Sequence, residues 1–379
     1  MTRPSSGRDL RIVCVSNGPL PYHTPILNEL AAAARLEVIY MSHGHPLQSF
    51  RDLWGVRPCF PYSFHWSWAL TAPRHDFRTQ LSVGVGRKLR RLDPDVVLVS
   101  SWGPLTWEPL VWARLSGCGA VVWAESTVWS GLTRGRLSNA GRRIVVNMAD
   151  AFVANGTCAA EFLRHFGVAE ERIVASRLPA PPRLMRTEPQ DRRSGHPRLL
   201  FVGRLIPRKR PLDTIKALSL LDRPEVSLTI VGDGPLEGDV RREAAKLGKR
   251  IEIRDRLESG DLDAVYASAD LLLVPSEREV WGLVVNEALA HGLFVIASDQ
   301  VGSAVDVLVE SSGSIVQTGN VNAFVAAIQH ALDTVDFTPA GREMRRRSVA
   351  AVTPERFAGD ILAAAALAAR SRPRQRRLR

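Results

Sequence analysis

Residues 271–292, LLLVPSEREVWGLVVNEALAHG, contain the pattern that decides the fold. The first four residues form a continuous aliphatic run, which ends at Pro275 and Ser276. A short polar loop follows, and apolar residues with helical spacing resume between Gly282 and Val284. A continuous aliphatic strand is typical of a parallel sheet that is buried on both faces. The stretch therefore predicts one strand–loop–helix unit of a doubly wound α/β domain.

The same alternation of strand and helix patterns runs along most of the chain. In the first half, strands are expected at residues 11–16, 36–40, 95–100, 120–124 and 151–154, with helices at 26–34 and 80–91. In the second half, strands are expected at 199–202, 227–231, 251–253, 271–274 and 294–297. Helices are expected between them at 211–221, 236–247, 260–267, 284–290 and 323–332, and a last one at 354–370.

The pattern breaks at residues 177–197, which are rich in Pro and Arg and lack periodicity, as expected of a linker. We therefore expect a Rossmann-like domain over residues 1–180, a second over 198–350, and a terminal helix with a basic tail over 351–379. The predicted fold class is α/β, with two doubly wound domains facing across a cleft. Ligands of such sheets bind beyond the carboxyl ends of the strands, so the loops there are the candidate sites.

Composition places the chain among globular proteins. With 379 residues, 45% hydrophobic and 23% charged, it is long enough for two cores. The first apolar run is short and ends at Asn17, Gly18 and Pro19, unlike a signal peptide, and no run reaches about 18 apolar residues. These features predict a cytoplasmic protein. The four cysteines form no C-x-x-C pair and are expected to be reduced and mostly buried.

The net charge of +11 is unevenly distributed, because residues 370–379 contain six Arg and no acid. Residues 130–148 form a second basic segment, with Arg134, Arg136, Arg142 and Arg143. Such segments are solvated faces or bind an anionic surface. No nucleic-acid-binding module accompanies them, so a lipid surface is favoured over nucleic acid.

The first candidate motif is FVGRLIPRKR at residues 201–210. Gly203 ends an expected strand, and four cations occupy the next seven positions, up to the helix expected at Pro211. Cations beside a helix N-terminus favour a diphosphate, although a solvated basic loop would have the same composition.

The second motif, VGDGPL at residues 231–236, also follows a strand. Gly232 and Gly234 begin a dinucleotide fingerprint, but the third glycine, Gly238, falls one place late and Pro235 occupies the helix start. This favours a turn that lines a nucleotide over an NAD site, and a plain turn remains the alternative.

The third motif places two carboxylates eight positions apart, Glu279 in the loop and Glu287 near the start of the helix. Free amides at a helix start attract phosphate and sugar oxygens, and a carboxylate can accept hydrogen bonds from two vicinal ribose hydroxyls. Apolar residues surround Glu287, which makes a merely solvated role improbable.

Together these segments resemble the retaining glycosyltransferases of family 4, also described as glycosyl transferases group 1, which have the GT-B fold. The resemblance covers residues 199–331 closely and the first half more loosely. It implies transfer of a sugar from a nucleotide-diphosphate sugar to a hydroxyl acceptor with retention, in the biosynthesis of polysaccharides, glycolipids or other glycoconjugates. The residues implied in catalysis are Arg204, Lys209 and Glu279, and those in donor binding are Gly203, Gly232, Gly234, Trp281, Gly282, Leu283 and Glu287.

On the acceptor side, the matching positions follow strands of the first domain. They are Gly18, His23, Glu125 and Ser126, with residues 101–103 at the end of another strand. The chain departs from the family pattern at Arg210, where Gly is frequent, at Trp281, where Phe is usual, and at Ser303 and Asp306. It also lacks the Asn-x-x-Asp that is typical near the linker. These departures leave the donor sugar open.

The expected mechanism needs no cofactor and no metal, because Arg204 and Lys209 can neutralise the departing diphosphate. The sequence has no convincing D-x-D, and His43, His45, His65 and His75 lack zinc-site spacing. The expected partners are a nucleotide-sugar donor and a lipid-linked acceptor, with attachment to the inner face of an anionic membrane. Two alternatives are an NAD(P)-dependent oxidoreductase, which would need a complete G-x-G-x-x-G at a first strand, and a non-catalytic nucleotide-sugar-binding protein.

Overall fold

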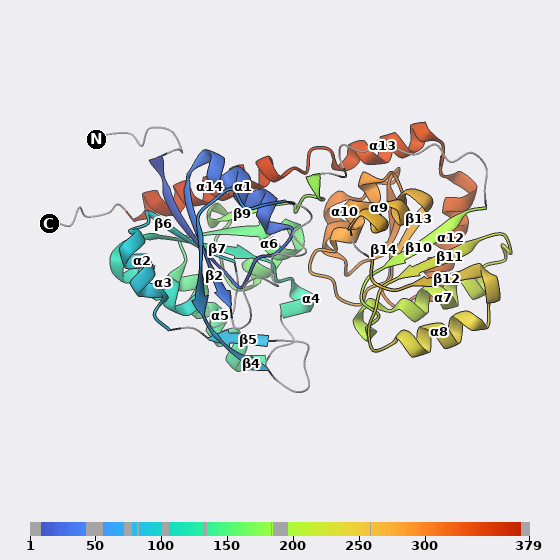
Figure 1. Ribbon diagram of the computed structural model, residues 1–379, viewed down its shortest axis with the longest axis horizontal. Coiled ribbons are helices and arrows are strands. Elements are labelled where there is room, and N and C mark those ends of the chain that lie inside the picture. The colour runs from blue at the N-terminus through green and yellow to red at the C-terminus, as the bar shows by residue number, and fades with distance from the viewer. Residues whose placement is uncertain are drawn as a thin grey trace. The chain divides into compact units, whose positions relative to one another are not determined.

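The computed structural model describes residues 9–42, 56–71, 78–81, 83–100, 106–131, 135–182, 184, 196–257 and 259–372. The chain forms two compact units, Met1–Leu178 with Pro354–Arg379, and Pro179–Thr353. Each unit contains a parallel sheet with helices packed on it (Figure 1). The predicted class, two Rossmann-like doubly wound domains, is therefore confirmed.

The first unit contains a seven-stranded sheet with the order β3-β2-β1-β6-β7-β8-β9. Its strands are β1 (Arg11–Ser16), β2 (Arg35–Ser42), β3 (Tyr62–Trp66), β6 (Val96–Val99), β7 (Gly119–Ala124), β8 (Ala151–Asn155) and β9 (Ile173–Ser176). Its helices are α1 (His23–Ala33), α2 (Val85–Leu92), α3 (Trp107–Ser116), α4 (Val128–Gly131), α5 (Gly135–Met148), α6 (Gly156–His165) and α14 (Pro354–Ser371). Strands β4 (Trp68–Thr71) and β5 (Arg78–Leu81) form a separate antiparallel pair.

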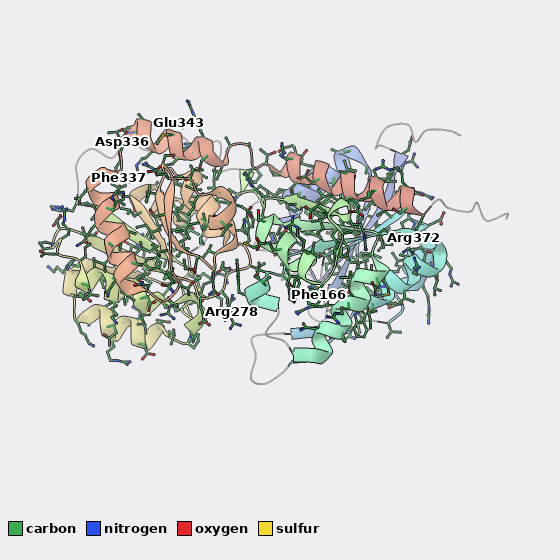
Figure 2. All side chains as sticks on the ribbon, turned by 180° about the vertical axis from the view of Figure 1, so that it is seen from behind. Phe166, Arg278, Asp336, Phe337, Glu343 and Arg372 are labelled. Carbon is green, nitrogen blue, oxygen red and sulfur yellow. The ribbon has the colours of Figure 1, made fainter. Side chains whose placement is uncertain are left out.

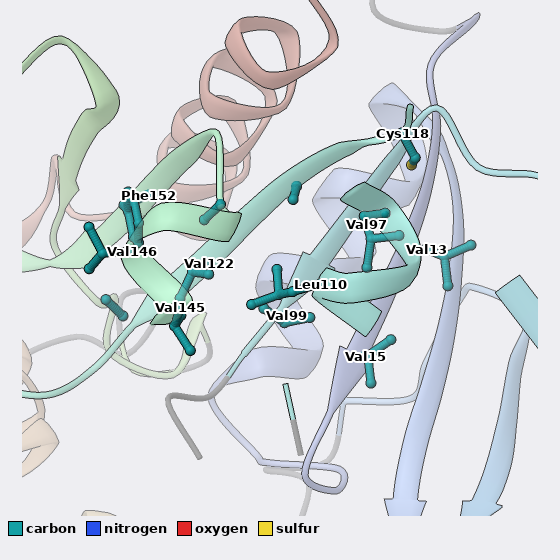
Figure 3. Packing of buried hydrophobic residues seen from close by; sticks show 14 of the residues in the cluster. Val13, Val15, Val97, Val99, Leu110, Cys118, Val122, Val145, Val146 and Phe152 are labelled. Carbon is teal, nitrogen blue, oxygen red and sulfur yellow. The ribbon is translucent and has the colours of Figure 1, made fainter. Parts of the chain in front are cut away.

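The two faces of this sheet have different helices, because side chains alternate along each strand. Val97, Val99 and Val122 pack with residues of α2, α3, α5 and α6 in one core cluster (Figure 3). Trp123 points to the opposite face, where its ring lies 4.9 Å from that of Phe357 in α14. Helices α2, α3 and α5 thus cover one face, and α1 and α14 the other.

Helix α14 belongs to the first unit, although the sequence analysis set residues 351–379 apart as a terminal segment. A Cβ on Gly119 would lie 2.9 Å from the backbone of Ala368, so only a glycine permits this approach of α14 to β7. At the end of α14 (Figure 2), Arg372 donates to Asp150 over 2.8 Å, and both side chains are largely buried. Small buried alanines and this ion pair attach the helix to the sheet.

The second unit contains a six-stranded parallel sheet with the order β12-β11-β10-β13-β14-β15. Its strands are β10 (Arg198–Val202), β11 (Ser227–Val231), β12 (Ile251–Arg254), β13 (Leu271–Val274), β14 (Phe294–Ser298) and β15 (Gly313–Val316). Its helices are α7 (Pro211–Leu220), α8 (Glu237–Ala245), α9 (Ser259–Ser268), α10 (Leu283–Ala290), α11 (Gly302–Val307), α12 (Val321–Thr334) and α13 (Pro339–Val349). Strand β10 lies at the centre, where the strand order reverses, and this is the usual position of a ligand site.

The sequence predicted the central strands within one or two residues and missed several edge strands and most helices of the first unit. The elements that were not anticipated are strands β3, β4, β5, β9 and β15 and helices α3, α4, α5, α6, α11 and α13. The helix expected at residues 80–91 begins later, at Val85, because a strand occupies Arg78–Leu81. Most of the expected linker, residues 177–197, lies outside the described part of the chain.

Three of the four cysteines are buried, and Cys59 is exposed. All four are free, in agreement with the prediction. Among the described residues, no helix is both long and apolar enough to span a bilayer.

Candidate functional site

Two loops meet backbone to backbone at the carboxyl edge of the second sheet, one after β10 and one after β11. Leu205 N donates to Asp233 O over 2.6 Å, and Gly203 N donates to Val231 O over 3.0 Å. A Cβ on Gly232 would lie 1.9 Å from Gly203 O, which no side chain allows. Gly234 is equally constrained by Leu205 O, at 2.6 Å. Both glycines, predicted to bind donor, therefore have a packing role that needs no ligand.

The basic motif folds into a short 3-10 turn, Pro207–Lys209, directly before α7. Lys209 forms an ion pair with Glu279, and each side chain is only 14% exposed. This pair joins the loop after β10 to the loop after β13, and Glu277 N donates to Arg208 O over 2.7 Å beside it. Arg204, by contrast, is exposed. The structure thus brings together the predicted cation and carboxylate and leaves a second cation accessible.

Arg210 has a left-handed backbone conformation, with φ of 52°. This explains why glycine is frequent at the matching position, since glycine alone adopts that conformation without a penalty of about 1–2 kcal/mol. The Arg210 side chain donates to Asp213 Oδ2 over 2.6 Å. Its guanidinium is therefore engaged within the start of α7, unlike that of the exposed Arg204.

The loop that contains Glu279 is held by the connection between β14 and α11. Glu279 N donates to Gln300 O over 3.0 Å, and Ser303 N donates to Trp281 O over 2.8 Å. A Cβ on Gly302 would lie 2.3 Å from Val280 O. These contacts fix the backbone of the loop before α10, which begins at Leu283 as predicted.

The Trp281 indole is buried, and its Nε1 donates to Asn286 Oδ1 over 3.0 Å. Its side chain is therefore committed to the interior, and a ligand at this loop would meet backbone. Gly282, with φ of 90°, caps α10, and Leu283 is its first residue. The first amides of a helix have no intrahelical acceptor and can bind phosphate or sugar oxygens.

Glu287 lies past the first turn of α10, and Tyr266 of α9 holds it. The Tyr266 hydroxyl donates to Glu287 Oε2 over 2.8 Å. Burial and the neighbouring Glu287 carboxylate raise the pKa of Tyr266 well above its ordinary value, so the phenol stays a proton donor. The Tyr266 ring stacks on His291 at 5.1 Å, and His291 Nδ1 lies 2.9 Å from Glu287 O. No sequence pattern connects Tyr266 with Glu287, because strand β13 and a loop separate the two residues along the chain.

In the first unit, His23 and Glu125 come together at the carboxyl edge of the sheet. His23 Nε2 lies 3.1 Å from Glu125 Oε1, and the His23 ring stacks on Trp123 at 4.1 Å. The Tyr22 hydroxyl and the Asn155 amide also donate to Glu125 Oε1, over 3.4 and 3.5 Å. His23 is only 1% exposed and begins α1, so it is not the surface loop residue that a lone histidine suggests.

The Glu125 side chain is 31% exposed although three groups hold one of its oxygens. Gly18 follows β1 and Ser126 follows Glu125 directly, and both are half-buried; a Cβ on Gly18 would meet nothing within 4 Å. Residues 101–103 lie outside the described residues. The edge of the first sheet thus presents a fixed, partly exposed carboxylate that can accept a hydrogen bond from a hydroxyl.

No group of three or more His, Cys, Asp or Glu residues in the described part of the chain is arranged to hold a metal ion.

Burial raises the pKa of the Tyr22 phenol, and the neighbouring Glu125 carboxylate raises it further. Tyr22, like Tyr266, therefore remains a proton donor.

Two Rossmann-like sheets, each with polar and charged loops at its carboxyl edge, are the architecture of the GT-B class. The description "Glycosyl transferases group 1" matches residues 186–347, and "Glycosyltransferase Family 4" matches residues 26–175. The chain belongs to the glycosyl transferases of group 1. This confirms the resemblance stated from the sequence.

Solved structures agree on the fold. The lipopolysaccharide outer core galactosyltransferase WaaB superposes with a TM-score of 0.71 at 15% identity, covering 93% of this chain and 98% of WaaB. HepE of Anabaena, in complex with UDP, superposes with a TM-score of 0.66 at 16% identity, covering 96% and 98%. At these identities the likeness establishes the fold alone.

Curated relatives match over shorter stretches. The D-inositol 3-phosphate glycosyltransferase of Corynebacterium glutamicum is 37% identical over 143 residues, which are 35% of this chain and 34% of the relative. The sulfoquinovosyl transferase SQD2 of Arabidopsis thaliana is 28% identical over 280 residues, 66% of this chain and 52% of the relative. The matched region thus spans between a third and about half of the length of these relatives.

Proposed function

We propose that this protein transfers a sugar from a nucleotide-diphosphate sugar to a hydroxyl acceptor with retention of configuration. The observation that carries the proposal is the Lys209–Glu279 ion pair at the carboxyl edge of β10 and β13, with Glu287 on the adjoining helix. A cation for the diphosphate, a carboxylate for sugar hydroxyls and a carboxylate for ribose are thereby held on one edge of one sheet.

In the proposed reaction, the bond between the anomeric carbon and the diphosphate oxygen breaks as the acceptor oxygen bonds to the same face. Lys209 and Arg204 stabilise the negative charge that develops on the departing diphosphate. Because Lys209 is paired with Glu279 in the free protein, donor binding would replace part of this contact with a phosphate. The departing phosphate takes the acceptor proton, so charge and atoms balance without a cofactor or a metal.

The donor base and sugar follow only from analogy. HepE of Anabaena has been solved with UDP and with UDP-glucose. This supports a uridine donor as the first to test, although Arg210 and Trp281 depart from the family pattern.

The acceptor would bind the first unit, where Glu125 is held by His23, Tyr22 and Asn155. Gly18 and Ser126 would complete this side. We propose that the acceptor is a lipid-linked sugar at the inner face of an anionic membrane, and that the protein is otherwise cytoplasmic. The product would enter a polysaccharide, glycolipid or other glycoconjugate.

The proposal is tested by thermal denaturation with UDP-, GDP-, ADP- and dTDP-sugars, with and without EDTA. One donor should raise the melting temperature of the wild type, equally with EDTA, and should raise that of Glu287→Ala much less. If no donor stabilises the protein, the proposed donor site is wrong; if stabilisation requires a metal, the metal-free mechanism is wrong.

A further inference from the structure

Helix α3 carries a stripe of exposed large apolar side chains on its outer side. Trp107, Val111 and Leu115 are 42%, 45% and 80% exposed. Their spacing of four residues places them on one side of the helix. Leu110 and Ala113, between them, are buried against the sheet, so the stripe is not part of the core. An ordinary surface has isolated apolar side chains, and an aligned row with a tryptophan suggests an interaction surface.

The stripe continues onto the two neighbouring helices. A Cβ on Gly141 of α5 would lie 3.2 Å from Cζ2 of Trp107, so the indole lies against α5, and Ile144 one turn later is 52% exposed. On the other side, Gly86 of α2 approaches the Trp112 ring, with 3.3 Å from its Cβ position to Cδ1. The outer sides of α2, α3 and α5, here called the α2–α3–α5 face, are therefore one continuous surface.

This face is strongly basic. The three helices contain eight Lys or Arg residues and a single acid, Glu108. Glu108 offsets one of these charges, and its Oε1 accepts from the amides of Gly84 and Gly86 at the start of α2, over 2.8 and 2.9 Å. The three helices therefore keep a large excess of positive charge. Among the side chains of these helices that the structure describes, the exposed cations are Arg87, Arg90, Arg91, Arg114 and Arg143.

We propose that the α2–α3–α5 face docks onto the interface of an anionic lipid bilayer. The arginines would contact lipid phosphates, and Trp107, Val111 and Leu115 would insert at the depth where aromatic and aliphatic side chains are favoured. Charge complementarity selects this occupant, because a stripe of apolar side chains bordered by cations matches an apolar layer bordered by phosphates. This deepens the proposed lipid-linked acceptor, and its test requires neither donor nor acceptor.

The structure also changes which residues carry the membrane contact. The sequence pointed to residues 130–148 and to the terminal tail. Arg142, in that segment, is buried, with its guanidinium over the rings of Phe162 and Phe166, at 5.3 and 5.9 Å from their centroids. It therefore cannot contact lipid, although Arg143 beside it is exposed. Helices α2 and α3, which the sequence did not single out, contribute the other exposed cations.

The test is co-sedimentation of the full chain with vesicles of phosphatidylcholine alone, or with about a third phosphatidylglycerol, at low and high salt. The wild type should pellet only with the anionic vesicles and at low salt, because exposed charges are screened within about 10 Å at 0.1 M. The triple variant Arg87→Gln, Arg90→Gln, Arg91→Gln should bind about a hundredfold more weakly, since each arginine near an anionic surface contributes a factor of about five. Leu115→Gln should bind the anionic vesicles about tenfold more weakly or worse, because it removes one inserted leucine.

Matched controls lie in the second unit. On α8 and directly after it, Arg241, Arg242 and Lys246 are exposed and pair with acidic neighbours. Replacing all three by Gln removes the same amount of positive charge from another part of the protein. Leu220→Gln changes a half-exposed leucine at the end of α7, as Leu115 lies at the end of α3. Both control proteins should bind anionic vesicles like the wild type.

Three results would overturn the proposal. The wild type could remain in the supernatant with anionic vesicles at low salt. The control variants could lose binding as much as the α2 and α3 variants, which would leave only non-specific charge attraction. Alternatively, light scattering could detect a dimer that Leu115→Gln dissociates, which would make the face an interface between copies. Thermal stabilisation by a donor should persist in every variant, so a failure here is distinguishable from a failure of the proposed reaction.

Discussion

The Tyr266–Glu287 hydrogen bond allows a sharp test of how the donor site is positioned. Tyr266→Phe removes the hydroxyl that lies 2.8 Å from Glu287 Oε2 and keeps the ring that stacks on His291. A hydrogen bond to a charged group stabilises a folded protein by about 1.5–3 kcal/mol. Glu287 is half-buried, so water can replace the phenol and reduce the loss. We therefore expect a loss of about 1 kcal/mol in nucleotide affinity, or about fivefold, measured by calorimetry with the nucleoside diphosphate of the stabilising donor.

The control is the double variant Tyr266→Phe, Glu287→Ala. If Tyr266 acts through Glu287, the double variant should bind the nucleotide as tightly as Glu287→Ala alone, because the hydroxyl has no carboxylate left to hold. The turnover number at saturating donor should change little, because the phenol does not touch the reacting atoms. An unchanged affinity in Tyr266→Phe, or an equal loss in the absence of Glu287, would refute this reasoning.

Four further predictions concern packing, thiols and catalysis. Gly232→Ala should destabilise the second unit by several kcal/mol in urea unfolding, because its Cβ would lie 1.9 Å from Gly203 O. The control Gly238→Ala, with open space around the added Cβ, should leave the free energy of unfolding unchanged. A thiol reagent should modify one cysteine of the native protein, Cys59, and all four after denaturation; a second fast thiol would contradict the burial. Burial raises the pKa of Cys14 from 9.0 to about 12, so the folded state binds more protons than the unfolded state in that range. The free energy of unfolding should then fall as pH rises above 9, by up to about 1.4 kcal/mol per unit, with a smaller slope in Cys14→Ala. Lys209→Ala should lower turnover by a factor equivalent to roughly 2–4 kcal/mol, and a loss of only a fewfold would remove the proposed role on the diphosphate.

Much of the fold follows from the sequence because the central strands are continuous aliphatic runs. Residues 271–274 and 227–231 were predicted with the bounds that the structure has. The sheet edges were harder, because an edge strand lacks a neighbour on one side and needs no continuous apolar run. Strand β3, YSFHW, alternates half-exposed aromatic and polar residues and has no such signal.

The neighbouring positions in the candidate site of the second unit could largely be predicted from the sequence, because these residues follow strands directly. Lys209 and Glu279 come from neighbouring parallel strands, which explains their contact. Two features could not be foreseen. The backbone contact between the loops at Gly203 and Gly232 depends on tertiary packing, and so does the buried partner Tyr266.

In the first unit, the sequence identified His23 and Glu125 separately and gave no reason to pair them. They are 102 positions apart, and the structure joins them because β1 and β7 end at the same edge of the sheet. The burial of His23 against Trp123 is likewise a property of the packed helix α1 and strand β7. Sequence spacing has no information on such pairs.

The proposed transfer reaction is tested most directly by the release of nucleoside diphosphate from the stabilising donor. The assay contains EDTA and a lipid extract as the source of acceptor, and it compares the wild type with Glu279→Gln. Glu279→Gln keeps the size of the side chain and removes the charge that pairs with Lys209. We predict that the wild type releases nucleoside diphosphate and labels a lipid product, and that Glu279→Gln is slower by about a hundredfold while the donor still stabilises it. Equal rates in the two proteins, or no release by the wild type with any donor that stabilises it, would contradict the proposed function.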